Sequence, residues 1–306
     1  MRAKFQIGLV GCGKWGRLIL RDLVALGCEV TVAVRSEEGR ASAQEGGAAK
    51  VVPAVDELPP VDGIIVATPT MTHAKVVESA LEQGVPVFVE KPLCDDPASA
   101  DRLAEAAPDR LFVMDKWRYH PGVELLGSIA RDEELGPVVG LRTSRLGWGN
   151  PHDVDAIWVL APHELSIGLE ILGELETPRT AVADAVDGYA FGLVGVLGVK
   201  PWHAIEVSAR AAERRREVHL ACEQGVAVLP AAYSEQIHVF RSTDPEVMTA
   251  PEPELRAISA ELPLLRELRA FLEHLDGGPP PRSSAAEGAS VVRRISELRE
   301  LARLPA

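Results

Sequence analysis

The chain has 306 residues, of which 46% are hydrophobic and 25% charged, a composition typical of a folded protein and not of a disordered one. Lys and Arg total 32 against 45 Asp and Glu, so the net charge is −13, which argues against general binding to nucleic acid or to anionic membranes. No run of about 18 apolar residues is present, so no transmembrane helix is expected. The length suggests two domains.

The first residues and the four cysteines bear on the cellular compartment in which the protein is expected. The apolar run at 5–10 leads straight into a glycine loop with no cleavage site after it, which argues against a signal peptide. The four cysteines are scattered, with no CxxC pair: Cys12, Cys28, Cys94 and Cys222. We expect reduced thiols in a cytoplasmic protein, and neither a disulfide framework nor a zinc site.

The first third of the chain alternates apolar runs with amphipathic helical runs. Strands are expected at 5–10, 29–34, 63–67, 85–89 and 111–114, and helices at 15–26, 73–83 and 98–107. This alternation predicts right-handed βαβ units and a parallel sheet covered on both faces.

The remainder of the chain is richer in strands. After a helix at 122–131 and a turn at 134–137, strands are expected at 138–146, 180–186, 192–197, 204–210, 217–221, 226–229 and 237–241. A helix at 162–172 interrupts them, the arginine-rich segment 210–216 looks like a hairpin connection, and helices at 263–275 and 285–301 close the chain. Strands without intervening helices predict an antiparallel sheet with one covered face.

A GxGxxG motif lies between the first expected strand and the first expected helix, the context that gives this motif its meaning. Its six residues are Gly11, Cys12, Gly13, Lys14, Trp15 and Gly16. Gly11 would permit a tight turn, Gly13 would let a pyrophosphate approach the backbone at the helix N-terminus, and Gly16 would allow close helix–strand packing. The motif therefore predicts a dinucleotide site, and the alternative is a glycine-rich turn without a ligand.

The end of the second expected strand indicates which dinucleotide binds. NAD-selective sites usually carry Asp or Glu there, whereas this chain has Arg35 and Ser36, followed by Arg40. Arg35 can pair with a 2′-phosphate and stack on adenine, and Ser36 can donate a hydrogen bond to the same phosphate. We predict NADP, with NAD as the alternative if Arg35 is merely solvated.

Three further stretches carry a family resemblance. Ala-Thr-Pro-Thr-Met-Thr-His at 67–73 follows the third strand, Glu-Lys-Pro-Leu at 90–93 follows the fourth, and Leu-Ala-Pro-His-Glu at 160–164 lies in the second half. Together with the glycine loop, they make nearly the whole chain resemble the Gfo/Idh/MocA oxidoreductases, and the Glu-Lys-Pro motif is the most specific element.

The resemblance implies an α/β protein with two sheets. A Rossmann domain with a doubly wound parallel sheet is expected at 1–118, and a substrate-binding and oligomerisation α/β domain with an open, mostly antiparallel sheet at 119–284. The C-terminal helix at 285–306 would pack back on the Rossmann domain. The family transfers a hydride between a nicotinamide and a hydroxyl or carbonyl carbon, mostly on sugars and cyclitols. We expect a homodimer or homotetramer with a sugar-like substrate, no metal, and neither a nucleic-acid nor a membrane partner.

Lys91 and His163 are the catalytic residues that the resemblance implies. An ammonium at the end of a parallel strand can hydrogen-bond the reacting oxygen, and a histidine can exchange protons near neutral pH. Without the resemblance, a surface lysine and a structural histidine would be the ordinary interpretations. The resemblance also implies cofactor contacts from Thr68, Pro69, His73, Glu90 and Lys91, and substrate contacts from Lys91, Arg118, Tyr119, Trp148 and His163. His73 could equally cap the helix that follows it.

Two departures from the family pattern bear on the substrate. Val159 stands where many members carry Asp, four residues before His163, and Glu164 stands where Asp is common. Asp153 or Asp155 could replace the missing carboxylate. The leading expectation is reduction of a keto-sugar, including a nucleotide-linked one. The alternatives are reduction of an imine or other non-sugar carbonyl, and a cofactor-bound regulatory protein without catalysis.

Two groups of side chains outside these motifs leave alternatives open. Arg214, Arg215 and Arg216 are most simply a solvated hairpin end, and a phosphate-binding patch for a nucleotide substrate is the alternative. The indole rings of Trp117, Trp148 and Trp158 could line a substrate pocket, or pack in the core or at a subunit contact.

Overall fold

The fold is that of a computed structural model, which describes residues 5–150, 154–241 and 249–305. It forms two compact units. The first contains residues 1–116 and 264–292, and the second contains residues 117–263 and 293–306. Residues 264–284 thus group with the first unit, where the sequence boundaries assign them to the second domain.

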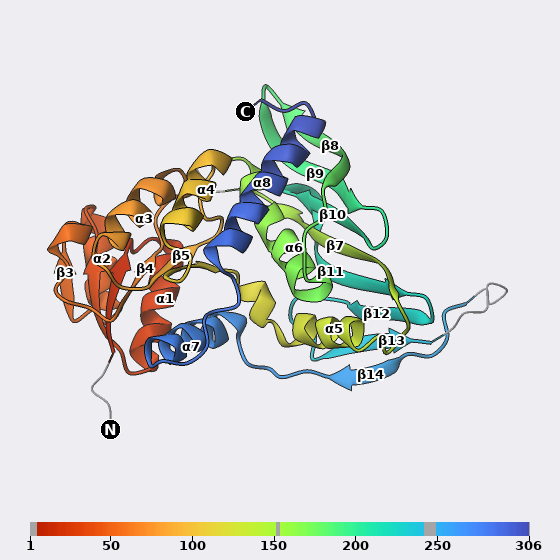
Figure 1. The fold of residues 1–306 in the computed structure, drawn as a ribbon, viewed down its shortest axis with the longest axis horizontal. Helices are drawn as coiled ribbons and strands as arrows, with labels where there is room; N and C mark the ends of the chain where they lie inside the picture. Colours follow the sequence, from red (N-terminus) through yellow and green to blue (C-terminus); the bar gives the residue numbers. More distant parts are fainter. Residues whose placement is uncertain (1–4, 151–153, 242–248, 306) are drawn as a thin grey trace. The chain divides into compact units, whose positions relative to one another are not determined.

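The first unit is built on a six-stranded parallel sheet with the order β3-β2-β1-β4-β5-β6 (Figure 1). Its strands are β1 (Gln6–Val10), β2 (Glu29–Ala33), β3 (Lys50–Val52), β4 (Gly63–Val66), β5 (Val87–Glu90) and β6 (Leu111–Met114). The connecting helices are α1 (Lys14–Ala25), α2 (Glu37–Glu45), α3 (His73–Leu81) and α4 (Pro97–Ala106). Short 3-10 turns lie at Val55–Glu57, Thr70–Thr72 and Lys116–Tyr119. The predicted doubly wound sheet is confirmed, and its strand order reverses between β1 and β4, the crevice where such sheets bind ligands.

Helix α7 (Pro263–Leu275) belongs to the core of this first unit from residue 264 onward. Its fully buried Leu268 and Phe271 join the cluster beneath the parallel sheet, and the Phe271 ring stacks on Phe88 of β5 with 4.9 Å between centroids. Helix α8 (Ala285–Leu301) follows, and the division into units falls within it, after Val292.

The second unit holds an eight-stranded sheet with the order β14-β13-β12-β11-β7-β10-β9-β8. Its strands are β7 (Val138–Trp148), β8 (Pro178–Val186), β9 (Tyr189–Gly198), β10 (Trp202–Ser208), β11 (Arg210–Cys222), β12 (Gly225–Leu229), β13 (Gln236–Phe240) and β14 (Glu254–Ala257). The β7–β10 pair is parallel and the other neighbouring pairs are antiparallel, so the expected mostly antiparallel sheet is confirmed.

Helices α5 (Pro121–Arg131) and α6 (Ala156–Leu172) cover one face of this sheet. Leu126 of α5 and Ile167 of α6 meet Leu141 of β7 and Leu220 of β11 in one buried cluster. Apolar residues recur at every second position of β7 and β11 in this region, because alternate residues of a strand face the helices.

The structure corrects two sequence predictions in this unit. The segment 210–216 is not a hairpin connection, because it forms the first half of β11, and β7 lies between β10 and β11. Helix α6 begins at Ala156 and not at Pro162, which lies inside the helix, because the Asp155 carboxylate caps it by accepting from the backbone N–H groups of Ile157 and Trp158.

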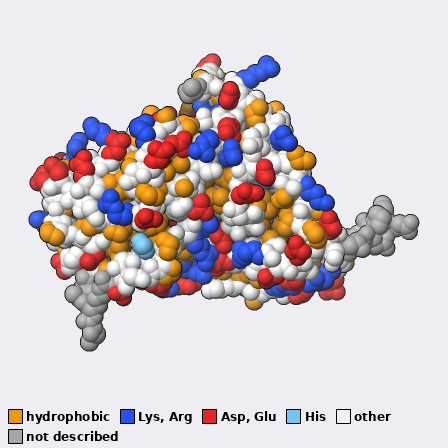
Figure 2. All heavy atoms as spheres, in the orientation of Figure 1, with side chains coloured by type: hydrophobic (Ala, Val, Ile, Leu, Met, Phe, Trp, Pro, Cys, Tyr) orange, Lys and Arg blue, Asp and Glu red, His pale blue; other side chains and the backbone are white. Residues whose placement is uncertain are grey.

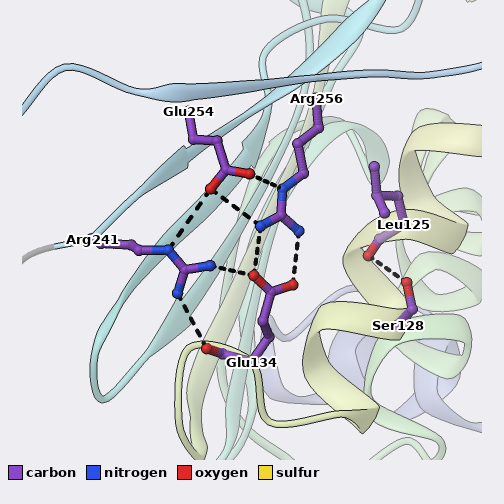
Figure 3. Close-up of polar contacts among 6 residues, drawn as sticks. All are labelled: Leu125, Ser128, Glu134, Arg241, Glu254 and Arg256. Carbon is purple, nitrogen blue, oxygen red and sulfur yellow. Dashed lines mark hydrogen bonds and ion pairs between the residues drawn. The ribbon is translucent and has the colours of Figure 1, made fainter.

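Three elements were not expected: α2, β3 and β14. Helix α2 is polar and buries only Gly39 and Ala43, and β3 has three residues, so neither carries a periodic apolar signal. Strand β14 pairs with β13 at the sheet edge, and a cluster of ion pairs links its residues to Glu134 and Arg241 (Figure 3). Arg256 donates to Glu134 at 2.7 Å and to Glu254 at 2.8 Å, and Arg241 also pairs with Glu134. Hydrogen bonds from Arg256 and Arg241 lower the pKa of Glu134 to about 2.

The surface carries charges of both signs. In the face drawn in Figure 2, acidic and basic side chains are interspersed with apolar ones. No helix within the described ranges is long and apolar enough to span a bilayer.

Candidate active site

The glycine loop after β1 shows which of its glycines the fold requires. Gly11 has a φ of +94°, and a Cβ there would lie 2.6 Å from the Ala67 carbonyl oxygen. A Cβ on Gly16 would lie 2.3 Å from the Gly11 carbonyl oxygen. Gly13 differs, because it is exposed and an added Cβ would meet nothing within 4 Å. The protein does not need glycine at position 13 for its own packing, so this residue keeps a space open.

The beginning of α1, next to Gly13, suits an anion. Among the residues that the structure describes, no side chain caps this helix N-terminus, and the first turn of the helix contains no acidic residue. Uncapped backbone N–H groups and the helix dipole together favour a negatively charged ligand. The open position at Gly13 and this helix end therefore fit the pyrophosphate of a dinucleotide.

The other residues of the loop have distinct surroundings. Lys14 is exposed, and the indole of Trp15 lies under the Lys116 ammonium, which is 3.9 Å from the ring centroid. Cys12 is buried, and burial raises the pKa of its thiol. Cys12 therefore acts as a small packing residue and not as a thiolate nucleophile.

The end of β2 presents the residues expected to contact the adenosine side of the cofactor. Arg35, Ser36 and Arg40 are exposed, and neither arginine forms an ion pair within the described part of the chain. The Ser36 hydroxyl oxygen caps α2 by accepting from Gly39 N–H at 3.1 Å, which leaves its own proton to donate. The first turn of α2 also carries Glu37 and Glu38, which would repel a phosphate placed against them.

His73 ties two loops of the first unit together. Its ring is buried, and its two nitrogens lie 2.8 Å from the carbonyl oxygens of Thr68 and Pro92. Burial lowers the pKa of His73. A neutral imidazole donates from one nitrogen only, so His73 hydrogen-bonds one of these two carbonyl oxygens, and its ring lies between the loop of Thr68 and Pro69 and the Glu-Lys-Pro turn.

Lys91 lies just beyond β5, at the carboxyl edge of the parallel sheet where the glycine loop also lies. It is half-buried, its backbone N–H donates to Glu90 Oε2 at 3.2 Å, and the Lys91–Pro92 peptide is cis. Burial raises the pKa of Glu90, and the charges of Lys91 and Lys116 oppose that effect.

Sequence reasoning missed Glu267 of α7, which lies near Glu90. Its side chain is fully buried, and neither carboxylate oxygen forms a hydrogen bond within the described residues. Burial, and then the charge of Glu90, raise the pKa of Glu267 well above its usual range. The signal in the sequence is a carboxylate on the apolar face of α7, three residues after Leu264 and four before Phe271.

His163 lies in α6 of the second unit, beside a buried ion pair. The next residue, Glu164, pairs with Arg145 of β7, whose guanidinium stacks over the Trp117 ring 4.5 Å from its centroid. Arg145, His163 and Glu164 are all buried. Because Glu164 anchors α6 to the sheet, it fixes the place of His163 in the unit.

The two candidates for the missing carboxylate have different outcomes. The Asp155 carboxylate already has two structural partners, because it caps α6 and pairs with Arg299. Asp153 lies outside the described residues. Val159 is partly exposed on α6, one turn before His163. Within the described ranges, no group of three or more His, Cys, Asp or Glu side chains is placed to hold a metal ion.

The remaining predicted substrate contacts lie in different surroundings within the second unit. Arg118 is buried and pairs with Glu170 at 3.3 Å, and Tyr119 is buried. Trp148 is 78% exposed at the end of β7. It lines a pocket of about 440 Å³ with Gly149, Asn150, Tyr189, Phe191, Ala209 and Arg210. In this pocket Asn150 donates to the Tyr189 hydroxyl at 2.7 Å, and Arg210 lies over the Phe191 ring at 4.7 Å.

Comparisons with known proteins agree with this geometry. The oxidoreductase family with an NAD-binding Rossmann fold, Gfo/Idh/MocA, matches residues 5–113. Myo-inositol dehydrogenase Hyg17 of Streptomyces leeuwenhoekii is 31% identical over 235 residues, which are 67% of this chain and 72% of that protein. UDP-N-acetylglucosamine 3-dehydrogenase of Acidithiobacillus ferrooxidans is 30% identical over 197 residues, and the match covers 62% of this chain and 59% of that protein.

Solved structures share the fold over almost the whole chain. The structure of UDP-N-acetylglucosamine 3-dehydrogenase GnnA from Acidithiobacillus ferrooxidans superposes with a TM-score of 0.84 at 24% identity, covering 98% of each chain. Levoglucosan dehydrogenase in complex with NADH and levoglucosan superposes with a TM-score of 0.85 at 16% identity, again covering 98% of each chain.

Proposed function

The chain belongs to the Gfo/Idh/MocA family of oxidoreductases, and from this premise we propose that it transfers a hydride between NADP and a carbonyl or hydroxyl carbon of a sugar or sugar-like substrate. One observation carries the proposal: the carboxyl edge of one parallel sheet holds both the open position at Gly13 and the side chain of Lys91. We also propose reduction of a keto-sugar, including a nucleotide-linked one, as the physiological reaction. The relative named UDP-N-acetylglucosamine 3-dehydrogenase supports that substrate class.

Each predicted residue has a chemical task in this reaction. The backbone at Gly11, Gly13 and Gly16 would hold the pyrophosphate, and the nicotinamide, when bound, supplies the hydride. The Lys91 ammonium hydrogen-bonds the reacting oxygen and donates a proton to it as the carbonyl is reduced. His163 assists proton exchange, and Arg118, Tyr119 and Trp148 contact the substrate.

The choice of NADP rests on the two unpaired cations after β2. Arg35 and Arg40 are free of ion pairs within the described residues, and a 2′-phosphate would supply their counter-charge. Glu37 and Glu38 act in the opposite direction. NAD is therefore the alternative that a binding experiment must test.

A titration of the wild-type protein and of Lys91→Ala with NADPH and NADH, followed by a keto-sugar screen, tests this function. We expect tighter binding of NADPH than of NADH in both proteins. Turnover should be lost only in Lys91→Ala, by roughly a hundredfold or more, the usual size of a general acid's contribution. Turnover that survives in Lys91→Ala would remove Lys91 from the mechanism, and tighter binding of NADH would overturn the choice of NADP.

A second candidate function has one observation in its favour. Val159 places an apolar side chain on α6, one turn before His163, where a carboxylate could have held a sugar hydroxyl. A less hydroxylated substrate, such as a cyclic imine, would suit that surface better. Including cyclic imines in the screen separates the two, because only the sugar function predicts turnover of keto-sugars alone.

Two properties of the whole protein complete the proposal. We expect a cytoplasmic location, which the four free thiols and the family support. We also expect a homodimer or homotetramer formed through the second unit, for which the apolar side chains exposed on β8 and β9 are the support.

A further inference from the structure

Two arginines lie directly opposite each other on the helix-covered face of the second sheet. Arg145 of β7 is the register partner of Arg216 of β11. Two residues further along, Thr143 is opposite Val218, and Val218 lies in the cluster packed against α5 and α6. Because residues two apart on a strand share a face, Arg216 points to the same side as Val218. Figure 1 shows the strands β7 and β11 side by side with α6 next to them.

This pairing is electrostatically unfavourable as it stands. Like charges directly opposite on a sheet destabilise it, and Arg145 is buried while Arg216 is half-buried. Glu164 compensates Arg145. Arg216 donates only to the backbone oxygens of Leu146 and Arg215, and no carboxylate pairs with it within the described residues. Burial and the charges of Arg145 and Arg214 lower the pKa of Arg216 to about 10.

Arg214 adds a third cation to the same place. Its charge acts on both Arg145 and Arg216, and its exposed guanidinium forms no ion pair with any described residue. Glu164 pairs with Arg145 and its charge also acts on Arg216, so two of the three guanidinium groups share one carboxylate, in a chain whose net charge is −13. A like-charged, partly desolvated group of this kind breaks the ordinary rules of sheet packing, and such exceptions are expected at functional sites.

We propose that Arg216 and Arg214 bind an anionic group of the substrate, a phosphate or a carboxylate, on the sheet face that packs against α6, the helix of His163. The planar fork of a guanidinium matches two oxygens of either group. Arg145 remains with Glu164, where it positions α6. The inference builds on the proposed function, which makes His163 part of the substrate site, and it narrows the substrate to sugars that carry a negative charge.

Calorimetric titrations of the full-length protein with inorganic pyrophosphate and with malonate test this site. The variants are Arg216→Gln and Arg214→Gln, with Arg215→Gln as the matched control. Arg215 is the next residue of the same strand, is opposite Leu146, and pairs with Glu206 at 2.9 Å. We expect anion binding to weaken roughly tenfold to a hundredfold in Arg216→Gln and measurably in Arg214→Gln, and to stay unchanged in Arg215→Gln.

Further arms make each outcome decisive. Each titration is run with and without NADPH, since pyrophosphate would also bind at the glycine loop. Tighter binding of pyrophosphate assigns the site to a phosphate-linked sugar, and tighter binding of malonate assigns it to a sugar acid. Equal anion affinity in the wild type and all three variants overturns the site. Arg216→Lys guards against misfolding because it keeps the charge, and it should retain part of the binding.

The outcomes separate this site from the proposed function. Hydride transfer to sugars that carry a phosphate or carboxylate at the same kcat/KM in the wild type and Arg216→Gln would leave the function standing and remove the anion site. Anion binding lost in Arg216→Gln, without hydride transfer on any sugar, would do the reverse.

Discussion

The environment of Glu267 conflicts with a negative charge. The carboxylate is fully buried in α7, and neither oxygen forms a hydrogen bond within the described residues. The pKa of Glu267 is raised by burial and then by Glu90, so the folded protein favours the protonated acid. The contribution of Glu267 to the free energy of unfolding is therefore fully present when the pH is below the pKa of this carboxyl in the unfolded chain, about 4.3. The contribution is lost as the pH rises through the pKa of Glu267 in the folded protein.

Glu267→Gln should flatten the dependence of stability on pH. The amide is neutral at every pH, so the free energy of unfolding of the wild type should fall relative to the variant by up to about 1.4 kcal/mol for each pH unit between the unfolded and folded pKa values. Urea unfolding at pH 5, 6, 7 and 8 measures this. Glu273→Gln, at an exposed position of the same helix, is the control. Parallel curves for the wild type and Glu267→Gln would show that Glu267 is ionised in the fold throughout this range.

Individual residues differ in how far the sequence could reveal them. The motif spacing brought attention to Gly11, Gly13 and Gly16, but only the structure separates Gly13, which the fold does not need, from the two glycines that it does. The role of His73 depends on two carbonyl oxygens, those of Thr68 and Pro92, from loops that no periodicity connects. Long-range polar contacts of this kind have no local signature in a sequence.

At the scale of elements, α7 carries the chain back into the first unit. Its Phe271 is fully buried against Phe88 of β5, with 4.9 Å between the ring centroids. We expect Phe271→Ala to lower the free energy of unfolding by about 3–5 kcal/mol, the usual effect of emptying such a site. Thermal and urea unfolding of the full chain would show it. Tyr233→Ala, at a position 82% exposed, should change stability by less than about 0.5 kcal/mol. A similarly small effect of Phe271→Ala would mean that α7 adds little to the core of the first unit.

The helices and strands that the sequence predicts correctly are those in which apolar residues recur with the period of the element and face the core. The six-residue error at the start of α6 arose because Pro162 resembles a helix start, whereas the Asp155 cap gave no apolar signal. The first half of β11 resembled a turn because arginines occupy the positions where a strand normally carries apolar residues. Strand β14 depends on Glu134, more than a hundred residues earlier, and on charge instead of apolar contact (Figure 3). These failures all lie where polar interactions replaced hydrophobic burial.

At the scale of the whole molecule, the uncovered face of the second sheet predicts self-association. Val182 of β8 and Val194 of β9 are register partners, so they lie side by side on one face, and they are 65% and 47% exposed. Covering such apolar side chains with a second copy removes them from water and protects the sheet from aggregation. A net charge of −13 opposes the contact, so association should strengthen as salt screens that repulsion.

Light scattering at micromolar concentration should therefore give the mass of a dimer or tetramer. The oligomer should dissociate less readily at higher ionic strength. Val182→Asp and Val194→Asp should each shift the protein toward the monomer. Each variant should remain folded, with a melting temperature no lower than that of the dissociated wild-type monomer. Val24→Asp, which changes an exposed valine of α1 in the first unit, should leave the mass unchanged. A wild-type monomer would contradict the association, and a dimer that survives both aspartates would place the contact on another surface of the chain.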